Sequence, residues 1–379
     1  MKFVNYRTSH LTSLILLIVL LNLILWQTNK ESSNKVTKFN KKFKIVESEK
    51  YIKVNETEQE DPWNFAKHSS IVYTWANGSI KEHQELYNKY KYNDTSLKMS
   101  FQRFRDNDEL RHALRSYSKH MSWHRGNIFL VVPDGHIPHW INLKHPRLRI
   151  IFQSSIVDEE DNPTFNTNAI EQNFYRIPGI SDQFIAINDD IFFGRDIEPQ
   201  DFFTLDKGVN FFFGNIPIDL KKIYSHHVIA SRQTTAKVLV NKYNITENIF
   251  ATRHAPFVYH KAAFPILKEI FKQELKTTST HKFRHVQDIV FPILHHYALM
   301  HEKKLKGLKY KFLEMKEMKG LKMLAVSDNE KRVLEEFEKI EIEKPKFFNL
   351  NDDYTKKHIA YLMKLFLFKS FPEKSPFET

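Results

Sequence analysis

Two adjacent carboxylates, Asp189 and Asp190, follow Asn188 directly after the apolar run 184–187. Such a run predicts a buried strand, and side chains at the carboxyl end of a strand are well placed to meet a ligand. Carboxylate oxygens suit a hard divalent cation, Mg²⁺ or Mn²⁺, which also bridges phosphate oxygens. Successive side chains on an extended backbone point in opposite directions, so one aspartate can bind the metal while its neighbour pairs elsewhere. The simpler alternative is a solvated Asp-Asp turn.

Five other side chains have types that suit phosphate chemistry. Arg111 and Arg115 are four residues apart on one face of a predicted helix and could together grip a diphosphate. His254 is a candidate general base near neutral pH, and Arg284 could stabilise charge on a transferring phosphoryl group. Glu171 lies on a short predicted helix. For each of these residues the alternative is an ordinary solvated or structural side chain.

The elements that must position these residues alternate between strands and helices. Four apolar runs predict strands, over residues 71–75, 128–132, 149–152 and 184–187. Helices are predicted over 102–120, capped by Asp106 or Asn107, and over 168–176, with Ile170, Phe174 and Ile177 facing inward. From residue 262 onward the pattern is mostly helical, with a Lys/Glu-rich stretch over 302–346.

Strands that are apolar throughout and alternate with helices indicate an α/β fold with a mostly parallel sheet covered on both faces. In such a sheet, ligands bind beyond the carboxyl ends of the strands. Asn77 follows the first predicted strand and Asp134 the second, so both are expected at the same edge as Asp189 and Asp190.

The composition fits one large core or two modest ones, with 41% apolar residues in 379 and no cysteine. Disulfides, thiolate metal sites and cysteine nucleophiles are therefore excluded. The net charge of +12 could indicate a nucleic-acid partner, but +5 of it lies within residues 30–53, which carry eight Lys and three Glu. The remainder is spread thinly, which argues against nucleic acid and favours a basic surface that meets anionic lipid or phosphate ligands.

The N-terminal region predicts a membrane anchor. Residues 11–27 are almost wholly apolar and near the lower limit for spanning a bilayer, and no small-residue cleavage site follows them. The sequence thus predicts a short cytoplasmic tail over 1–10, a transmembrane signal anchor over 11–27, a charged stem over 28–62 and a catalytic domain over 63–379. The charges that flank the span favour the opposite orientation, so the type II orientation rests on the chemistry described below.

Read together, four blocks resemble the Stealth family of sugar-phosphate transferases. The family includes the lysosomal-enzyme N-acetylglucosamine-1-phosphotransferase catalytic subunit, fungal xylosylphosphotransferases and bacterial capsule-polymer phosphotransferases. The blocks appear in the family's order and cover most of residues 71–378: 71–79 (IVYTWANGS), 104–203 (beginning FRDNDELR), 253–288 (from RHAP to RHVQD) and 348–372 (from FNLNDD to FP).

The resemblance implies a fold like that of nucleotide-sugar transferases, with a helical C-terminal part, and an active site of Glu171, Asp190, His254 and Arg284. Asn77, Asp189 and Arg111 occupy matching motif positions with less defined roles. The first block departs from the family pattern, because Ser70 and Ile80 stand where the family has acidic residues.

The function that this implies is transfer of a sugar 1-phosphate from a UDP-sugar to a glycan hydroxyl, expected on mannose, with release of UMP. Because such donors and acceptors meet in the Golgi lumen, the catalytic domain is expected there. A homo-oligomer is compatible with the sequence. Two alternatives remain: a metal-dependent glycosyltransferase that releases UDP, and a non-catalytic glycan-binding or assembly protein of the same fold.

Overall fold

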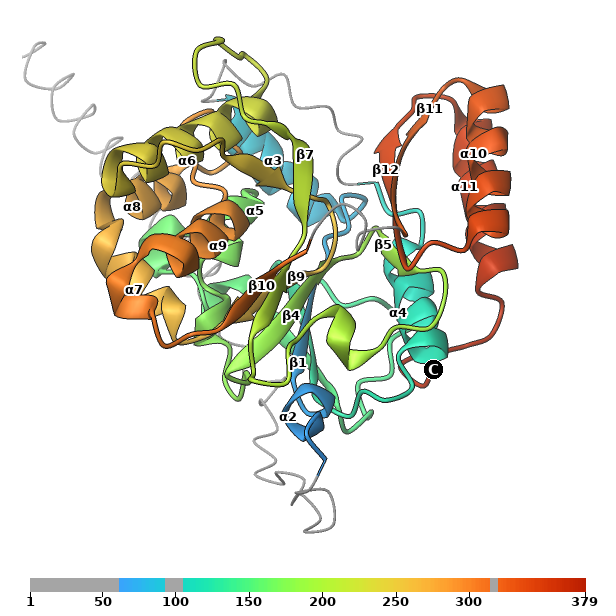
Figure 1. Cartoon of the computed structure of the whole chain (residues 1–379). Helices are drawn as coiled ribbons and strands as arrows, with labels where there is room; N and C mark the ends of the chain where they lie inside the picture. The colour runs from blue at the N-terminus through green and yellow to red at the C-terminus, as the bar shows by residue number, and fades with distance from the viewer. Residues whose placement is uncertain (1–60, 93–104, 314–319) are drawn as a thin grey trace, which may run out of the picture. The chain divides into compact units, whose positions relative to one another are not determined.

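The computed structural model describes residues 61–92, 105–313 and 320–379. Its main sheet has five strands in the order β3-β2-β1-β4-β9 (Figure 1). The strands are β1 (Ser70–Thr74), β2 (Ile128–Val132), β3 (Leu148–Phe152), β4 (Gln183–Asn188) and β9 (Phe257–His260). The first four are parallel and β9 runs antiparallel to β4. The four predicted strands and the mostly parallel sheet are thus confirmed.

The centre of this sheet is buried on both faces, as the apolar runs predicted. Tyr73 in β1 pairs in register with Leu130 of β2 on one side and Ile187 of β4 on the other. All three side chains are at most 2% exposed. β-Branched and aromatic residues at every position can be accommodated only where helices cover both faces, because neither side of the strand meets water.

Helices cover both faces of the main sheet. Figure 1 shows α5 to α9 on one side and α4 on the other. The covering helices are α4 (Glu109–His120), α5 (Thr167–Glu171), α6 (His227–Tyr243), α7 (Ala263–Ile270), α8 (Lys272–Thr280) and α9 (Phe291–His301). The smaller elements are α2 (Asn64–Lys67), α3 (Lys81–Tyr92) and two strand pairs: β6 (Val209–Phe211) with β10 (Tyr310–Phe312), and β7 (Phe213–Pro217) with β8 (Phe250–Thr252).

The expectation of a helical C-terminal part is wrong over residues 321–327 and 347–353, which form strands. A second sheet forms there in the order β11-β12-β5, from β11 (Leu321–Ser327), β12 (Phe347–Asp353) and β5 (Ile191–Phe193). In β11 the buried Leu324 and Val326 alternate with the exposed Met323 and Ala325. This period of two indicates a strand, but the neighbouring lysines and glutamates hid it.

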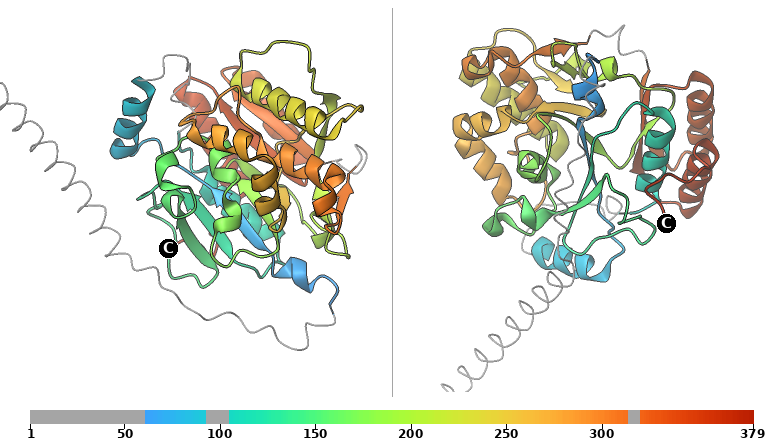
Figure 2. Two further views of the ribbon diagram at one scale, coloured as in Figure 1. Left: turned by 90° about the vertical axis from the view of Figure 1, so that its left-hand side faces the viewer. Right: turned by 90° about the horizontal axis from the view of Figure 1, so that it is seen from below.

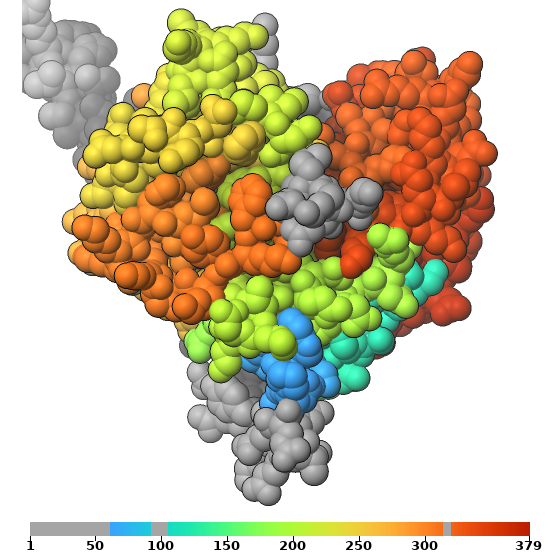
Figure 3. All heavy atoms as spheres, in the orientation of Figure 1, coloured from blue at the N-terminus to red at the C-terminus, as the bar shows by residue number. Residues whose placement is uncertain are grey.

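Two helices complete the C-terminal segment, α10 (Glu330–Glu343) and α11 (Lys357–Ser370). They lie on the outer side of β11 and β12 in Figure 1, and both helices are visible from below in Figure 2. In Figure 3 the same segment forms the orange-red right-hand part of the surface, and the segments of α6 and α9 form part of the left-hand side. Because β5 follows directly after Asp190, the second sheet approaches the carboxyl end of β4.

Two predicted helices are shorter than expected. The helix predicted over 102–120 begins at Glu109, because Asp108 adopts a left-handed conformation (φ 71°) and its N–H donates to Asp106 Oδ1 at 2.9 Å. The helix predicted over 168–176 is α5, followed by a separate 3-10 turn over Phe174–Arg176. The inward-facing residues predicted for it, Ile170, Phe174 and Ile177, are buried as expected.

The predicted tail, anchor and nearly all of the stem lie outside the described residues. Among the residues that the structure describes, no helix has both the length and the apolar character needed to span a bilayer.

Candidate active site

The candidate site lies where the connections between strands change direction. From β1 the chain passes to β2 and β3 on one side, and then to β4 on the other side of β1. The carboxyl ends of β1 and β4 therefore flank the crevice in which ligands bind in open α/β sheets. Because β9 runs antiparallel to β4, with Phe257 opposite Ala186, the residues that precede β9 reach the same edge. This topology brings His254 to Asp190.

His254 and Asp190 form a partly exposed pair. Nε2 of His254 lies 3.2 Å from Oδ1 of Asp190 and 3.4 Å from Nδ2 of Asn188. The side chains of His254 and Asp190 are 27% and 20% exposed, so a ligand can reach both. In the tautomer with hydrogen on Nε2, Asp190 accepts that hydrogen bond and Nδ1 keeps its lone pair. A histidine oriented by a carboxylate in this way can act as a general base.

The second sheet holds Asp190 from its other side. Nδ2 of Asn349 in β12 donates to Oδ2 of Asp190 at 2.5 Å, and the N–H of Leu350 donates to the Asp190 carbonyl at 3.1 Å. The carboxylate is thus fixed between β12 and His254, which restrains its orientation. Asn349 lies within the last family-like block, over 348–372, but no role was predicted for it.

Glu171 is a buried acid beside two basic groups. It ends α5, and its side chain is 9% exposed. Burial raises the pKa of Glu171 to about 7, against the opposing influence of Arg284 and His254. A carboxyl with a pKa near neutrality, close to a histidine and an arginine in a crevice, is suited to proton transfer.

Arg284 completes the group of four residues that the resemblance implied. Its Nε donates to Oγ1 of Thr167 in α5 at 3.0 Å. Burial lowers the pKa of Arg284, and the nearby carboxylates of Glu171, Asp288 and Asp190 raise it. The structure therefore brings Glu171, Asp190, His254 and Arg284 together, although the first and the last of them lie more than a hundred residues apart in sequence.

The loop that carries Arg284 is fixed by a fully buried carboxylate. Oδ2 of Asp288 accepts from Asn166 Nδ2 at 2.8 Å and from the N–H of His285 at 2.8 Å, and Oδ1 lies 2.8 Å from Nδ1 of His281. Asn166 also caps α5, because its Oδ1 accepts from the N–H of Asn168 at 3.1 Å. One network thus positions both the helix of Glu171 and the loop of Arg284.

Asp189 provides an available carboxylate next to Asp190. Burial, followed by Asp190, Glu109 and Asp106, raises the pKa of Asp189 well above its usual range. Converging carboxylates of this kind are stabilised by a cation. Mg²⁺ needs only one or two carboxylates when phosphate oxygens and water complete its shell, so Asp189 and Asp190 fit the divalent cation. In the described ranges, no three His, Asp or Glu side chains are grouped so as to hold a metal by themselves.

Arg115 binds the C-terminal segment. Its guanidinium forms two 2.8 Å hydrogen bonds to the carboxylate of Glu378 and donates to the Phe371 carbonyl at 3.1 Å. The side chains of Arg115 and Glu378 are 9% and 3% exposed. The guanidinium of Arg115, one of the two expected to grip a diphosphate, is therefore engaged in a structural ion pair.

The other expected binding residues are Arg111, Asp134 and Asn77, and their ion pairs and hydrogen bonds are made with residues outside the group of four. Arg111 pairs with Asp108 at 2.9 Å, and its guanidinium lies 4.9 Å from the centre of the Trp140 ring. Asp134 is exposed and accepts from the Ser154 hydroxyl. Asn77 Oδ1 accepts from the hydroxyl and N–H of Ser79 at 2.6 and 2.8 Å. None of these three residues contacts the group of four.

The altered residue Ser70 lies at the opposite edge of the sheet. It begins β1, whereas the site lies beyond Thr74 at the other end of that strand. Its hydroxyl accepts from the N–H of Ser181 at 3.0 Å, and its own N–H donates to the Ser181 hydroxyl at 2.7 Å. This departure from the family pattern therefore does not remove a group from the site.

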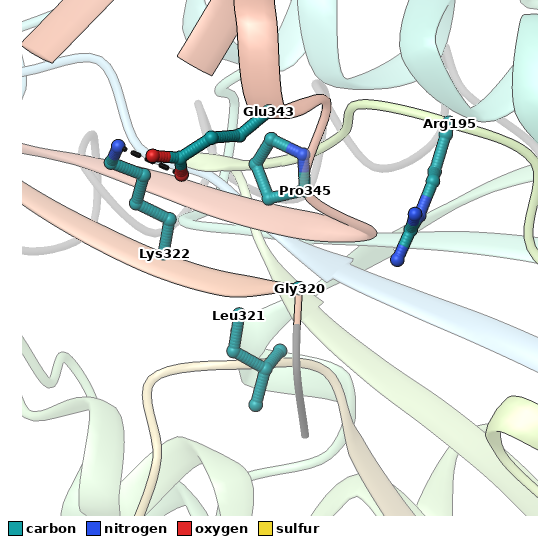
Figure 4. Close-up of a pocket in the computed structure, with 6 residues that line it drawn as sticks. All are labelled: Arg195, Gly320, Leu321, Lys322, Glu343 and Pro345. Atoms are coloured by element: carbon teal, nitrogen blue, oxygen red, sulfur yellow. Dashed lines mark hydrogen bonds and ion pairs between the residues drawn. The ribbon is translucent and has the colours of Figure 1, made fainter. Parts of the chain in front are cut away.

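A surface hollow of about 350 Å³ lies elsewhere, at the end of β5 away from Asp190. It is lined by Arg195, Gly320, Leu321, Lys322, Glu343 and Pro345 (Figure 4). Lys322 and Glu343 pair with each other at 3.1 Å, and Arg195 is the third charged residue of the lining. The hollow contains none of the residues expected to carry chemistry.

Two family models match the chain. Stealth protein CR2, conserved region 2, matches residues 103–211, which include Glu171, Asp189 and Asp190. Stealth protein CR3, conserved region 3, matches residues 253–301, which include His254 and Arg284. The two matched regions thus contain all four members of the group.

Several characterised proteins are similar to the chain. An exopolysaccharide phosphotransferase of Streptomyces coelicolor is 31% identical over 81% of this chain and 51% of its own length. Capsular polysaccharide phosphotransferase SacB of Neisseria meningitidis serogroup A is 29% identical over 66% of this chain and 46% of its own. N-acetylglucosamine-1-phosphotransferase subunits alpha/beta of Mus musculus are 46% identical over 29% of this chain and 9% of theirs.

The chain spans about half or less of the length of these relatives. Among solved structures, galactosyltransferase LgtC in complex with donor and acceptor sugar analogues matches with a TM-score of 0.40 and 10% identity, over 80% of this chain and 96% of that one. The two matched regions agree with the second and third of the four blocks read from the sequence. The chain belongs to the Stealth family.

Proposed function

We propose that the chain transfers a sugar 1-phosphate from a UDP-sugar to a glycan hydroxyl, forming a phosphodiester and releasing UMP. The observation that carries this proposal is the convergence of Glu171, Asp190, His254 and Arg284 beyond the carboxyl ends of β1 and β4. The relatives support it, because they are an exopolysaccharide phosphotransferase, a capsular polysaccharide phosphotransferase and an N-acetylglucosamine-1-phosphotransferase.

In the proposed reaction, His254 accepts the proton of the acceptor hydroxyl. The acceptor oxygen forms a bond to the phosphorus that carries the sugar, and the bond from that phosphorus to the bridging oxygen breaks. The electron pair leaves with UMP. Asp190 orients the imidazole through its 3.2 Å contact and stabilises the positive charge that the imidazole gains. Arg284 stabilises charge on the phosphoryl oxygens.

A divalent cation bound to Asp189 and Asp190 would neutralise charge on the donor diphosphate. Asp190 keeps its hydrogen bonds to His254 and Asn349, so Asp189 is the carboxylate with no such partner in the described part of the chain. Positioning and electrostatics, rather than covalent chemistry with the protein, would supply most of the catalysis.

For the acceptor we propose a mannose-containing glycan, and for the location a type II anchor in the Golgi membrane with the catalytic domain in the lumen. The location follows from the need for a nucleotide-sugar donor and a glycan in one compartment. Removal of residues 1–29 tests the anchor, because the truncated protein should be soluble and should retain its transferase activity. An aggregated, inactive truncation would contradict it.

The reaction type is tested by incubating the purified protein with a panel of UDP-sugars and glycan acceptors and identifying the nucleotide product. Release of UMP that depends on the acceptor is expected. Release of UDP would indicate a metal-dependent glycosyltransferase instead, and no nucleotide release with any donor would favour a non-catalytic glycan-binding role.

A further inference from the structure

A second arginine, Arg232, lies outside the four family-like blocks but close to Arg284 in the fold. Arg232 is in α6, between the buried Ser231 and Gln233, and its own side chain is only partly exposed. No ion pair or hydrogen bond to its guanidinium is found among the described residues. A guanidinium in this setting loses part of its hydration without gaining a protein partner, which is costly.

Two hydrogen bonds attach this part of α6 to the segment that follows Arg284. The hydroxyl of Thr234 donates to the Val286 carbonyl at 2.8 Å, and the hydroxyl of Thr235 accepts from the N–H of Val290 at 2.9 Å. These contacts fix α6 against the 284–290 segment and so bring Arg232 to the site. In agreement with this placement, burial and the charge of Arg284 lower the pKa of Arg232.

The acids around the two arginines do not balance their charge. Glu171 has a pKa of about 7 and so carries only part of a negative charge at neutral pH. Asp288 is committed to the hydrogen bonds that fix its loop, and Asp190 pairs with His254 and Asn349. Two neighbouring guanidiniums without full compensation repel each other, and a ligand with more than one negative charge would relieve that repulsion.

We propose that Arg232 and Arg284 together bind the diphosphate of the nucleotide-sugar donor, from α6 and from the 281–288 loop respectively. This assignment rests on the proposed function for the identity of the donor. It also replaces the diphosphate grip expected of Arg111 and Arg115. Arginine is suited to the task, because its planar group donates two parallel hydrogen bonds to phosphate oxygens.

The test is titration calorimetry of the full-length protein with UDP, uridine and inorganic pyrophosphate. Arg232→Gln should weaken UDP and pyrophosphate binding by about 10- to 100-fold, the range for a lost charge-assisted hydrogen bond. Uridine binding should stay unchanged, and the melting temperature of the ligand-free protein should not fall, because the substitution removes an uncompensated charge next to Arg284. Arg232→Lys should recover part of the lost affinity, because lysine restores the positive charge but cannot donate two parallel hydrogen bonds from one planar group. Arg332→Gln, an exposed site on α10 with the same change in charge, is the matched control.

The outcomes separate this inference from the proposed function. Unchanged UDP and pyrophosphate binding in Arg232→Gln would overturn the inference, as would an equal loss of uridine binding. A wild-type protein that binds neither UDP nor uridine would overturn the UDP-sugar assignment. In that case, loss of pyrophosphate binding in Arg232→Gln would still support the arginine pair, and retention would overturn it.

Discussion

The raised pKa of Glu171 makes the unfolding free energy of the protein depend on pH. Its pKa rises from 4.5 to about 7 on folding because its side chain is buried. A shift of this size corresponds to about 3 kcal/mol. Because the folded state holds the proton more tightly, this contribution to stability is complete below pH 4.5 and is lost as the pH rises through 7. The substitution Glu171→Gln removes the titration while keeping a similar shape.

The assay is urea denaturation of the wild-type protein and Glu171→Gln at pH 5 and pH 8. The variant's unfolding free energy, taken relative to wild type, should increase by about 2–3 kcal/mol between the two pH values. Arg284, His254 and Tyr259 lie close enough to Glu171 to interact electrostatically, and comparison at both pH values measures the combined effect. Glu338→Gln, on the exposed face of α10, is the control and should show no such trend. A difference that does not change with pH would refute the argument that Glu171 is a buried acid with a raised pKa.

Three further substitutions test the remaining assignments. Asp190→Asn should abolish transfer with little effect on the fold, because an amide is a poor metal ligand. Full activity in the variant, or of the wild-type protein in EDTA, would contradict the metal assignment. His254→Ala should lower turnover about 10²–10⁴-fold while leaving donor affinity intact, as measured by steady-state kinetics and calorimetry; a near-normal rate would make it a structural histidine. Arg115→Ala should lower the unfolding free energy by about 3 kcal/mol, because it removes both hydrogen bonds from the guanidinium to the buried Glu378, and should not affect donor affinity. Loss of donor affinity without loss of stability would restore its expected role in binding.

The parts of the fold that could be predicted are those where local pattern and tertiary environment agree. The strand β2 was predicted with its observed bounds, because a run of apolar residues ended by Pro133 and Asp134 has few other interpretations. The position of Asp190 followed from the end of β4 in the same way. The strand β11 was missed because only Leu324 and Val326 are buried in it, and the stretch around it is rich in lysine and glutamate.

The pairing of side chains across the chain could not be predicted from local pattern. Arg115 and Glu378 are 263 residues apart, and nothing in the spacing of Arg111 and Arg115 indicates which of them faces the C-terminal segment. Arg232 was missed for a similar reason, since α6 has no motif and its contact with the Arg284 loop depends on two threonine hydroxyls. Asn349 reaches Asp190 only because β12 pairs with β5, a pairing between segments more than 150 residues apart.

The central claim is that the phosphorus attached to the sugar moves to the acceptor at the site of Asp190 and His254. The most direct measurement uses a UDP-sugar labelled with radioactive phosphorus at that position, together with a glycan acceptor. The account predicts that the label enters the glycan as an acid-labile sugar phosphodiester, that unlabelled UMP is released, and that Asp190→Asn transfers no label. Label that remains in UDP, while the sugar alone appears on the glycan, would contradict it.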